Sequence, residues 1–527
     1  MNEIFQRKPW LSYAALGALW ALVAFLVIPT WGWTYWDFGD GNYLYVARRV
    51  REGLVLYKDV LAPQPPLHII AGMIAQSIGN LFHNELFGVR AYSLLSRFAA
   101  SFVLFLIGRK LYGNEFKAVA CAAIYLFTPI GFWWSMAYES ENLEIVFLLL
   151  AMLFLIRLRR NSLMLAGIFS ALACHCNMTA VPYFIVNTIF LIFRKPRLAA
   201  WYAGAFVIFY GATAVAANIW TDGYFADNVL FNQVGTFPRT DILQASDPND
   251  SFLKYALRKI SSEGFKVLEI EGGLIAAAFA GMISILLRTP FPGNGSSPEP
   301  SSPNAFLVVE YLAWSAIGLM LSICFTAKGG TVNYIFCLGE AGVALFAAEG
   351  FCLLWSGRFM RGASLRNTRP ILMLVAAIVV TGAICISPAA NIRMTLNQQQ
   401  SELPETAMNQ IRDQITTHAK PGDEILAPPF YAYATRTNVT GELAENYIWN
   451  IKYMNETFDR EQGPAVAKMH EIANAIAEKK PRIILLDTAQ TGRVPEIANA
   501  VRAHYQPADP AEYQSRNVRL EVWIPRK

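Results

Sequence analysis

The sequence predicts a polytopic α-helical membrane protein of about 11 transmembrane helices with a small α/β soluble domain at its C-terminal end. Of its 527 residues, 54% are hydrophobic and only 16% are charged, whereas a soluble protein would carry roughly 25% charged residues. The deficit falls on residues 1–388, where long apolar runs alternate with short polar loops. Residues 389–527 have the composition of a soluble protein. We therefore expect a transmembrane domain at 1–388 and a separate folded domain at 389–527.

Eleven apolar runs are candidate membrane-spanning helices. They are Leu11–Trp31, Ala91–Gly108, Ala118–Trp134, Leu143–Ile156, Leu163–Cys176, Val181–Phe193, Ala200–Ile219, Leu268–Leu287, Phe306–Phe325, Tyr334–Trp355 and Pro370–Ser387. The first run resembles a signal peptide in outline, but no small-residue cleavage site follows it, so we expect a retained helix. A twelfth run, Pro66–Phe82, has only about 17 residues and several polar side chains, which makes it marginal as a span.

The distribution of positive charge predicts the orientation. Basic residues cluster at Arg7/Lys8, Arg109/Lys110/Lys117, Arg157/Arg159/Arg160, Arg194/Lys195/Arg197, Arg288 and Arg358/Arg361/Arg366/Arg369. Basic loops stay on the cytoplasmic side, and this alternation holds only if Pro66–Phe82 lies in the outer interface. The sequence thus predicts a multi-pass protein of the plasma (inner) membrane with a cytoplasmic N-terminus, an external loop at 32–90 and an extracytoplasmic C-terminal domain. No basic stripe interleaved with aromatic residues indicates nucleic acid as a partner.

The C-terminal domain shows alternating helical and strand patterns, which are typical of a small α/β layer structure. We expect helices at Glu402–Ala419, Val466–Lys479 and Pro495–Tyr505, and strands at Asp423–Ala427, Arg482–Asp487 and Val518–Ile524. No glycine-rich phosphate loop, metal-ligand spacing or nucleophile elbow stands out. Scaffolding or acceptor binding over a membrane site is the role we expect.

The external loop at 32–90 carries the first candidate site residues. Asp37 and Asp40 follow the first apolar run among aromatic residues. Aspartate and glycine are also common turn formers, so a structural turn is the alternative. The amphipathic helix Tyr43–Leu54 follows and presents Arg48, Arg49 and Arg51. Basic helices of this kind usually anchor to the membrane surface, and capture of a phosphate is the second interpretation.

The order of motifs in this region resembles a known family. Seven features follow one another along the chain: an aspartate, an amphipathic helix, a glycine, an aromatic residue, the pair Pro65-Pro66, a short apolar helix, and Gly88-Val89-Arg90 at the start of a span. This order resembles the polyprenyl-phosphate-sugar-dependent glycosyltransferases of the C superfamily, closest to the branch of protein O-mannosyltransferases and lipid A aminoarabinose transferases. The resemblance covers roughly residues 31–218. It implies a GT-C-like fold with juxtamembrane helices in the first external loop.

The resemblance also implies roles for individual residues. The family's proposed catalytic base falls on Asp40, while the glutamate that usually follows it is Gly41 here. The family's acidic residue in the second external loop falls on Glu141, beside Glu139. Asp40 and Glu141 would then be the ligands of a possible divalent metal, Mg or Mn. Asp37 and Glu139 are other candidates for the second acid.

Two basic positions of the family are neutral in this sequence. The lysine that precedes the proline pair corresponds to Gln64, and a lysine after the fifth span corresponds to Asn177. These departures concern the metal and the identity of the donor more than the fold.

The chemistry of lipid-phosphate sugar donors explains why such residue types suit the site. A carboxylate base must take the proton of the acceptor hydroxyl, a role typically worth about 10²–10⁴-fold in rate. Cationic groups or a divalent metal must stabilise charge on the departing phosphate. As the cationic groups we assign Arg90, with Arg48, Arg49, Arg51 and, about two turns further along the span, Arg97. Direct displacement would invert the anomeric configuration. The expected partners are a polyprenyl-phosphate sugar donor and an acceptor glycan, lipid or protein.

Other polar residues have a functional and a structural interpretation. Arg97 and Glu144 fall within predicted spans, where ionisable groups are costly, so they either face a cavity or form an interhelical pair. The triplet Cys174-His175-Cys176 resembles a metal motif but lacks the further ligands that a structural metal needs. His68 is expected to pack at the interface.

Two other classes of function are open. A transporter or lipid flippase would favour paired, Gly/Pro-interrupted helices in corresponding positions of two halves, a pattern we do not find in this sequence. A non-catalytic envelope assembly protein would use its C-terminal domain to dock partners.

Overall fold

The computed structural model describes residues 8–31, 38–60, 62, 64–134, 137–231, 252–288, 333–356, 405–442, 464–488, 492, 494–514 and 519–526. Two of the predicted spans, Phe306–Phe325 and Pro370–Ser387, lie outside these residues, as does Asp37.

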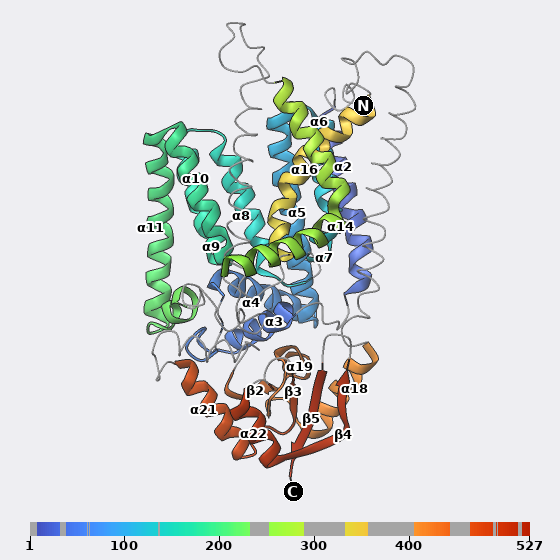
Figure 1. The fold of residues 1–527 in the computed structure, drawn as a ribbon, viewed down its shortest axis with the longest axis vertical. Helices are drawn as coiled ribbons and strands as arrows, with labels where there is room; N and C mark the ends of the chain where they lie inside the picture. The colour runs from blue at the N-terminus through green and yellow to red at the C-terminus, as the bar shows by residue number, and fades with distance from the viewer. Residues whose placement is uncertain are drawn as a thin grey trace.

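Long helices form a bundle in which they run roughly side by side (Figure 1). The bundle contains α2 (Trp10–Val27), α5 (Glu85–Tyr112), α6 (Glu115–Leu126), α8 (Ser140–Leu155), α9 (Arg160–Cys176), α10 (Val181–Arg194), α11 (Pro196–Trp220), α14 (Phe252–Arg288) and α16 (Asn333–Ser356). The prediction of one helix over Ala118–Trp134 is wrong in detail, because α6 ends at Leu126 and α7 (Pro129–Trp134) follows. Proline suits the first turn of a helix but not its interior, so Pro129 begins a new helix.

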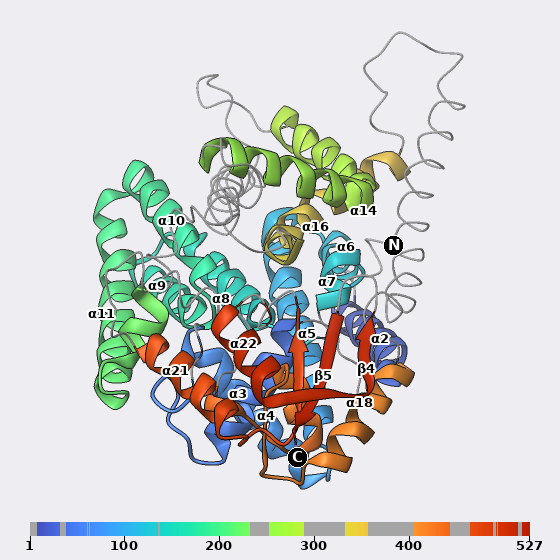
Figure 2. The ribbon, with the colours of Figure 1, turned by 60° about the horizontal axis from the view of Figure 1, so that its bottom comes forward.

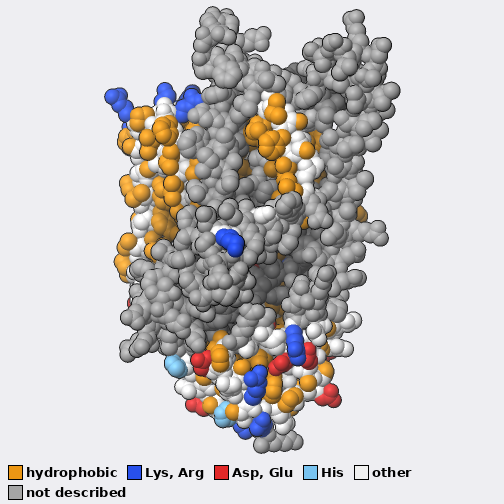
Figure 3. Space-filling model, viewed as in Figure 1, with side chains coloured by type: hydrophobic (Ala, Val, Ile, Leu, Met, Phe, Trp, Pro, Cys, Tyr) orange, Lys and Arg blue, Asp and Glu red, His pale blue; other side chains and the backbone are white. Residues whose placement is uncertain are grey.

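Three described helices, α2, α5 and α11, are long and apolar enough to cross a membrane. Shorter apolar helices cover Met178–Arg194 and Ile270–Ile283. Large apolar side chains such as Phe193, Ile208 and Ile219 are exposed on the outside of the bundle, and Figure 3 shows apolar side chains along its flank. Contiguous exposed apolar surface on helices of this length is what a lipid-facing surface requires.

Two helices of the first loop lie between the bundle and the strands (Figure 1). They are α3 (Phe38–Arg51) and α4 (Pro66–Leu81), which pack on each other, and α4 also packs on α5. The α4–α5 contact depends on Gly79 and Gly88, because a Cβ at Gly88 would collide with the backbone carbonyl of Ala75. This contact fixes the direction in which the first turns of α5 face α3.

The strands all lie in residues 405–526 among the described parts of the chain, a region that we call the C-terminal module. Its helices are α18 (Glu405–His418), α19 (Pro429–Thr435), α21 (Pro464–Ala477) and α22 (Pro495–His504). Strands β3 (Ile484–Asp487), β5 (Arg519–Pro525) and β4 (Tyr505–Gln514) form an antiparallel sheet in the order β3-β5-β4, and β1 (Glu424–Ile425) pairs in parallel with β2 (Asn438–Val439). Figure 2 shows α21 and α22 beside this sheet.

The predicted helices and strands of this region are confirmed to within a few residues, whereas α19, β2 and β4 were not predicted. Strand β4 has the sequence YQPADPAEYQ. Proline and acidic residues are uncommon in strands, so residue propensities do not predict a strand here.

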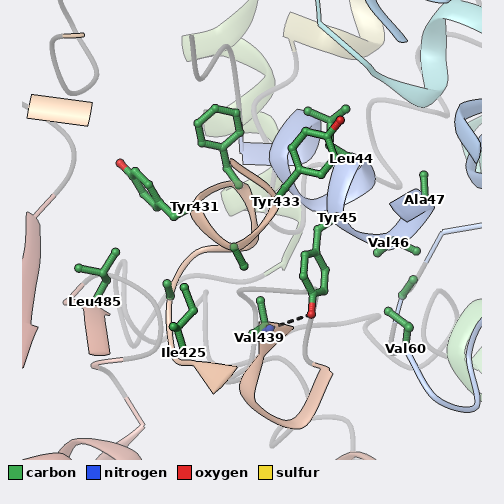
Figure 4. Packing of buried hydrophobic residues seen from close by; sticks show 14 of the residues in the cluster. Leu44, Tyr45, Val46, Ala47, Val60, Ile425, Tyr431, Tyr433, Val439 and Leu485 are labelled. Atoms are coloured by element: carbon green, nitrogen blue, oxygen red, sulfur yellow. Dashed lines mark hydrogen bonds between the residues drawn. The ribbon is translucent and has the colours of Figure 1, made fainter. Parts of the chain in front are cut away.

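A hydrophobic core joins the first loop to the C-terminal module. Buried Leu44, Tyr45 and Val46 of α3 belong to the same cluster as Phe430 and Tyr433 of α19. Figure 4 shows these two helices facing each other, with Val439 close to the end of the Tyr45 side chain. The module is therefore packed on the first-loop helices as part of one core.

Candidate functional site

A buried ion pair between Asp40 and Arg90 lies at the junction of the bundle and the first loop. The guanidinium of Arg90 donates to both carboxylate oxygens of Asp40, Nη1 to Oδ1 at 2.6 Å and Nη2 to Oδ2 at 2.7 Å. Both side chains are 0% exposed. The backbone N–H of Tyr138 also donates to Oδ1 at 2.7 Å. Bidentate, charge-assisted contacts of this type are strong and fix the relative orientation of both groups.

The local structure explains why the two residues meet. Asp40 lies in the first turn of α3, where a carboxylate is favoured by the N-terminal end of the helix. Arg90 lies in the second turn of α5, whose start is fixed by the side chain of Asn84 accepting from the N–H of Phe87. The structure thus brings the predicted base and the first predicted phosphate ligand into direct contact.

The predicted acids of the second external loop lie close by along the chain. Glu141 is in the first turn of α8 and is buried, and its Oε1 accepts from the amide of Asn177 at 2.9 Å. Glu141 follows Tyr138, which contacts Asp40, by three positions, a chain span of at most about 11 Å. Glu139, also buried, immediately precedes α8. Asn177 therefore contacts the acid of this loop from the position where the resembled family has a lysine.

A cluster of aromatic side chains lies beside Asp40. The ring of His68 lies against that of Tyr138 with centroids 4.2 Å apart, and Tyr43 meets His68 edge-on at 4.8 Å. The hydroxyl of Tyr138 donates to the backbone carbonyl of His68 at 2.6 Å, in space left by the missing side chain of Gly72. Burial lowers the pKa of His68 to about 3, so this imidazole is neutral. His68 is completely buried, and its place at the membrane interface stays a prediction.

The three arginines of the first-loop helix make contacts within the protein. Arg48 donates to the backbone carbonyls of Ala432 and Thr437 in the C-terminal module. Arg49 forms a bidentate pair with Glu442 of the same module. Arg51 pairs with Glu85 at the start of α5, at 2.6 Å. Their assignment to the donor phosphate remains a prediction, and it would require each of these contacts to open.

Arg97 contacts a different set of groups, inside the bundle. It pairs with Glu340 of α16 at 3.4 Å and donates to Thr128 at 2.7 Å and to the carbonyl of Tyr125. Glu340 also accepts from the backbone N–H of Gly131 at 2.6 Å. An interhelical Arg–Glu pair is present, but Arg97 pairs with Glu340 and not with Glu144, so a pair between Arg97 and Glu144 as one of our two interpretations is wrong.

Glu144, in the predicted span Leu143–Ile156, accepts from Thr179 at 2.7 Å. No group of three or more His, Cys, Asp or Glu side chains with metal-binding geometry occurs among the described residues. In the triplet of residues 174–176, both cysteines are buried free thiols, and His175 contacts Thr213.

The hydrogen bonds that Asp40 and Glu141 accept argue against a cation bound between them in this arrangement. Each Asp40 oxygen accepts from a guanidinium or a backbone N–H, and Glu141 accepts from an amide. A cation would have to displace Arg90, and hydrogen-bond donors cannot ligate it. The arrangement therefore does not fit a metal shared by Asp40 and Glu141, and we derive no step through one.

Several contributors to this site carry no signal in the sequence. The backbone N–H of Tyr138 is invisible to any residue-type argument. Gln76 donates to the carbonyl of Leu44 at 2.8 Å and so ties α4 to α3. Glu442 and Glu340 lie hundreds of residues from the arginines that they contact, so only a covariation between the paired positions could have predicted them.

Comparisons with known proteins agree on the fold. The model of the dolichyl-phosphate-mannose-protein mannosyltransferase family matches residues 64–220. The structure is similar to the crystal structure of ArnT from Cupriavidus metallidurans bound to undecaprenyl phosphate, with a TM-score of 0.54 and 11% identity over 97% of each chain. For ArnT in the apo state the TM-score is 0.52, with 11% identity over 98% of each chain. No curated protein matches by sequence. The resemblance to glycosyltransferases of the C superfamily is thereby confirmed, as is an ArnT-like helical membrane fold.

Proposed function

We propose that this chain is a membrane glycosyltransferase that moves a sugar from a polyprenyl-phosphate donor to an acceptor hydroxyl, with Asp40 as the base. The observation that carries the proposal is the buried Asp40–Arg90 pair at the junction of α3, α5 and the loop before α8. A carboxylate and a guanidinium in direct contact are the two groups that this chemistry requires. The family match and the ArnT-like fold, one example of which holds undecaprenyl phosphate, support the class of donor.

The proposed reaction begins with an exchange of partners. A donor phosphate attracts Arg90, which then leaves one or both oxygens of Asp40. The freed carboxylate accepts a hydrogen bond from the acceptor hydroxyl and takes its proton as the oxygen attacks the anomeric carbon. The bond from that carbon to the phosphate oxygen breaks, its electron pair stays on the phosphate, and Arg90 stabilises the charge. A single displacement inverts the anomeric configuration.

The proposed topology comprises eleven spans, a cytoplasmic N-terminus and an extracytoplasmic C-terminal module. Its support is the arrangement of the ends of the bundle. Lys195 connects α10 to α11 at the end of the bundle away from the C-terminal module (Figure 1), and Lys and Arg side chains gather at this end (Figure 3). Basic loops at the end opposite the module agree with the positive-inside rule.

The test uses purified protein in lipid nanodiscs with a panel of undecaprenyl-phosphate hexoses and pentoses. Asp40→Asn should lower the transfer rate by about 10²–10⁴-fold while binding of undecaprenyl phosphate is retained. Asp222→Asn is the matched control, because Asp222 is exposed and pairs only with the exposed Lys58 among the contacts described for it. A folded Asp40→Asn protein with wild-type transfer would refute the role of the base. Lipid movement across vesicles without a glycosidic product would indicate a flippase instead.

A further inference from the structure

Helix α3 connects the proposed base to the C-terminal module. Asp40 lies in its first turn, and Tyr45, Arg48 and Arg49 follow in its later turns. At about 1.5 Å per residue, the nine residues from Asp40 to Arg49 cover about 14 Å. A rigid helix of this length transmits a displacement at one end to the other. The contacts at its module end therefore bear on the position of Asp40.

One carboxylate of the module, that of Glu442, receives contacts from two side chains of α3. Arg49 donates to it twice, from Nε at 2.9 Å and from Nη2 at 2.5 Å. The hydroxyl of Tyr45 donates to it at 2.8 Å and accepts from the backbone N–H of Val439 at 2.7 Å. Burial, followed by the charge of Glu442, raises the pKa of Tyr45, so its hydroxyl stays protonated as a donor. Figure 4 shows the Tyr45 side chain reaching into the module.

Arg48 makes a second, independent connection. Its side chain is 4% exposed, and its guanidinium donates to the carbonyls of Ala432 at 3.1 Å and Thr437 at 2.5 Å. The same guanidinium lies over the rings of Tyr45 and Tyr433, 5.1 and 5.9 Å from their centroids. A buried guanidinium needs such partners, because unsatisfied buried charge is costly. This side chain thus connects α3 to α19 and to the residues that follow α19.

The backbone at Glu442 is strained. Its φ is 51°, in the left-handed region that residues other than glycine rarely adopt, and it follows Gly441 with φ 71°. Such conformations cost about 1–3 kcal/mol and persist only where the surroundings over-determine them. The contacts of Glu442 with Arg49 and Tyr45 are the interactions that hold its side chain against α3. Strain retained at a contact between two parts of the chain points to a role for that contact.

We infer that the C-terminal module holds Asp40 in its reactive position through α3, with Glu442, Arg49 and Tyr45 as positioning residues. The inference rests on the proposed function. On the membrane side α3 is held by Asp40–Arg90, by Gln76 and by Arg51–Glu85. When Arg90 turns to the donor phosphate, the contact at the Asp40 end weakens. The module, together with the contacts of Gln76 and Arg51, then keeps α3, and with it the base, in place.

The test compares Glu442→Gln and Tyr45→Phe with Glu512→Gln. Glu442→Gln keeps the shape of the side chain but removes the charge that binds Arg49, and Tyr45→Phe removes one hydroxyl. Glu512→Gln is the matched control, because Glu512 belongs to the same module and pairs with Arg519 on the surface. We expect kcat, counted per site that binds undecaprenyl phosphate, to fall about 10-fold in Glu442→Gln and less in Tyr45→Phe, since small misplacements of reacting groups are costly in rate. The KM for the donor should change less than about 2-fold.

A second measurement separates this inference from the proposed function. Hydrogen exchange of the amides of residues 41–49 should be faster in Glu442→Gln than in wild type or in Glu512→Gln. The double variant Glu442→Gln/Tyr45→Phe should lose less kcat than the sum of the two single losses, since both changes remove contacts to the Glu442 carboxylate, although Tyr45→Phe also leaves the N–H of Val439 without its acceptor. Wild-type protein without transfer activity would refute the proposed function. Hydrogen exchange would then still test whether the contact of Glu442 holds α3. An unchanged kcat per site in Glu442→Gln, or unchanged hydrogen exchange in its α3, would overturn the inference. If Glu442→Gln does not fold, the same two measurements are made on the milder variant Tyr45→Phe.

Discussion

Replacement of Arg90 by methionine should destabilise the protein more than any exchange of a surface arginine. Methionine keeps much of the apolar volume of the side chain and removes the guanidinium, so Asp40 stays buried with the N–H of Tyr138 as its remaining described partner. Both side chains of the pair are 0% exposed, with contacts of 2.6 and 2.7 Å. Removing one partner of such a pair costs about 3–5 kcal/mol.

The double variant Asp40→Asn/Arg90→Met identifies the cause of this loss. Asparagine still accepts from the N–H of Tyr138, and no charge is left buried, so more than half of the lost stability should return. The coupling between the two sites should be at least about 2 kcal/mol. The assay is unfolding in detergent followed by intrinsic fluorescence. The control is Arg519→Met, which opens a surface pair with Glu512 worth at most about 1 kcal/mol. Additive losses in the double variant would refute the buried-pair reasoning.

Three further outcomes are expected. Burial holds the pKa of His68 at about 3 in the folded chain, whereas in the unfolded chain it is about 6.5. The free energy of unfolding therefore falls as the pH drops through this window. His68→Phe should remove about 2 kcal/mol of the loss between pH 7 and 5, and an unchanged pH dependence of the thermal midpoint would contradict this. Glu340→Gln should destabilise the bundle by about 3–5 kcal/mol because it leaves Arg97 buried without the carboxylate that it contacts. The control is Glu478→Gln, which opens an exposed pair with Lys480 and should cost at most about 1 kcal/mol; equal losses in the thermal midpoint would refute the difference. Gly88→Ala should cost about 1–3 kcal/mol by pushing α4 from α5, with Gly17→Ala, which has free space, as the control; a wild-type thermal midpoint would contradict it.

The sequence predicted those features that depend on local patterns. Apolar runs marked the helices of the bundle, whereas the caps Asn84 and Asn114 begin helices at Glu85 and Glu115, before the apolar runs that were predicted to begin at Ala91 and Ala118. The assignment of Asp40 and Arg90 to one site came from the order of motifs, and the structure places them in contact. An ordered series of motifs is informative because each motif positions the next along a short stretch of chain.

Contacts between distant parts of the chain could not be predicted. A basic face on the helix that follows Asp40 indicates an anionic or carbonyl-rich partner, but it does not say whether that partner is a lipid, a phosphate or another part of the protein. Arg49 pairs with Glu442, which is 393 residues away, and Arg97 pairs with Glu340, which is 243 residues away. The prediction of α6 and α7 as one helix failed for a local reason, because hydropathy continued across Pro129.

The partners of the arginines decide which of them can leave for a donor phosphate. If Arg48 moved away, two backbone carbonyls in a buried region would lose their donor, at about 1–3 kcal/mol each. If Arg49 moved away, the contact that holds Glu442 and the module against α3 would open. Arg90 exchanges one anion for another, and the carboxylate that it leaves gains the acceptor hydroxyl as a new donor. The exchange at Arg90 therefore conserves the number of charge-assisted contacts, and it couples arrival of the donor to release of the base.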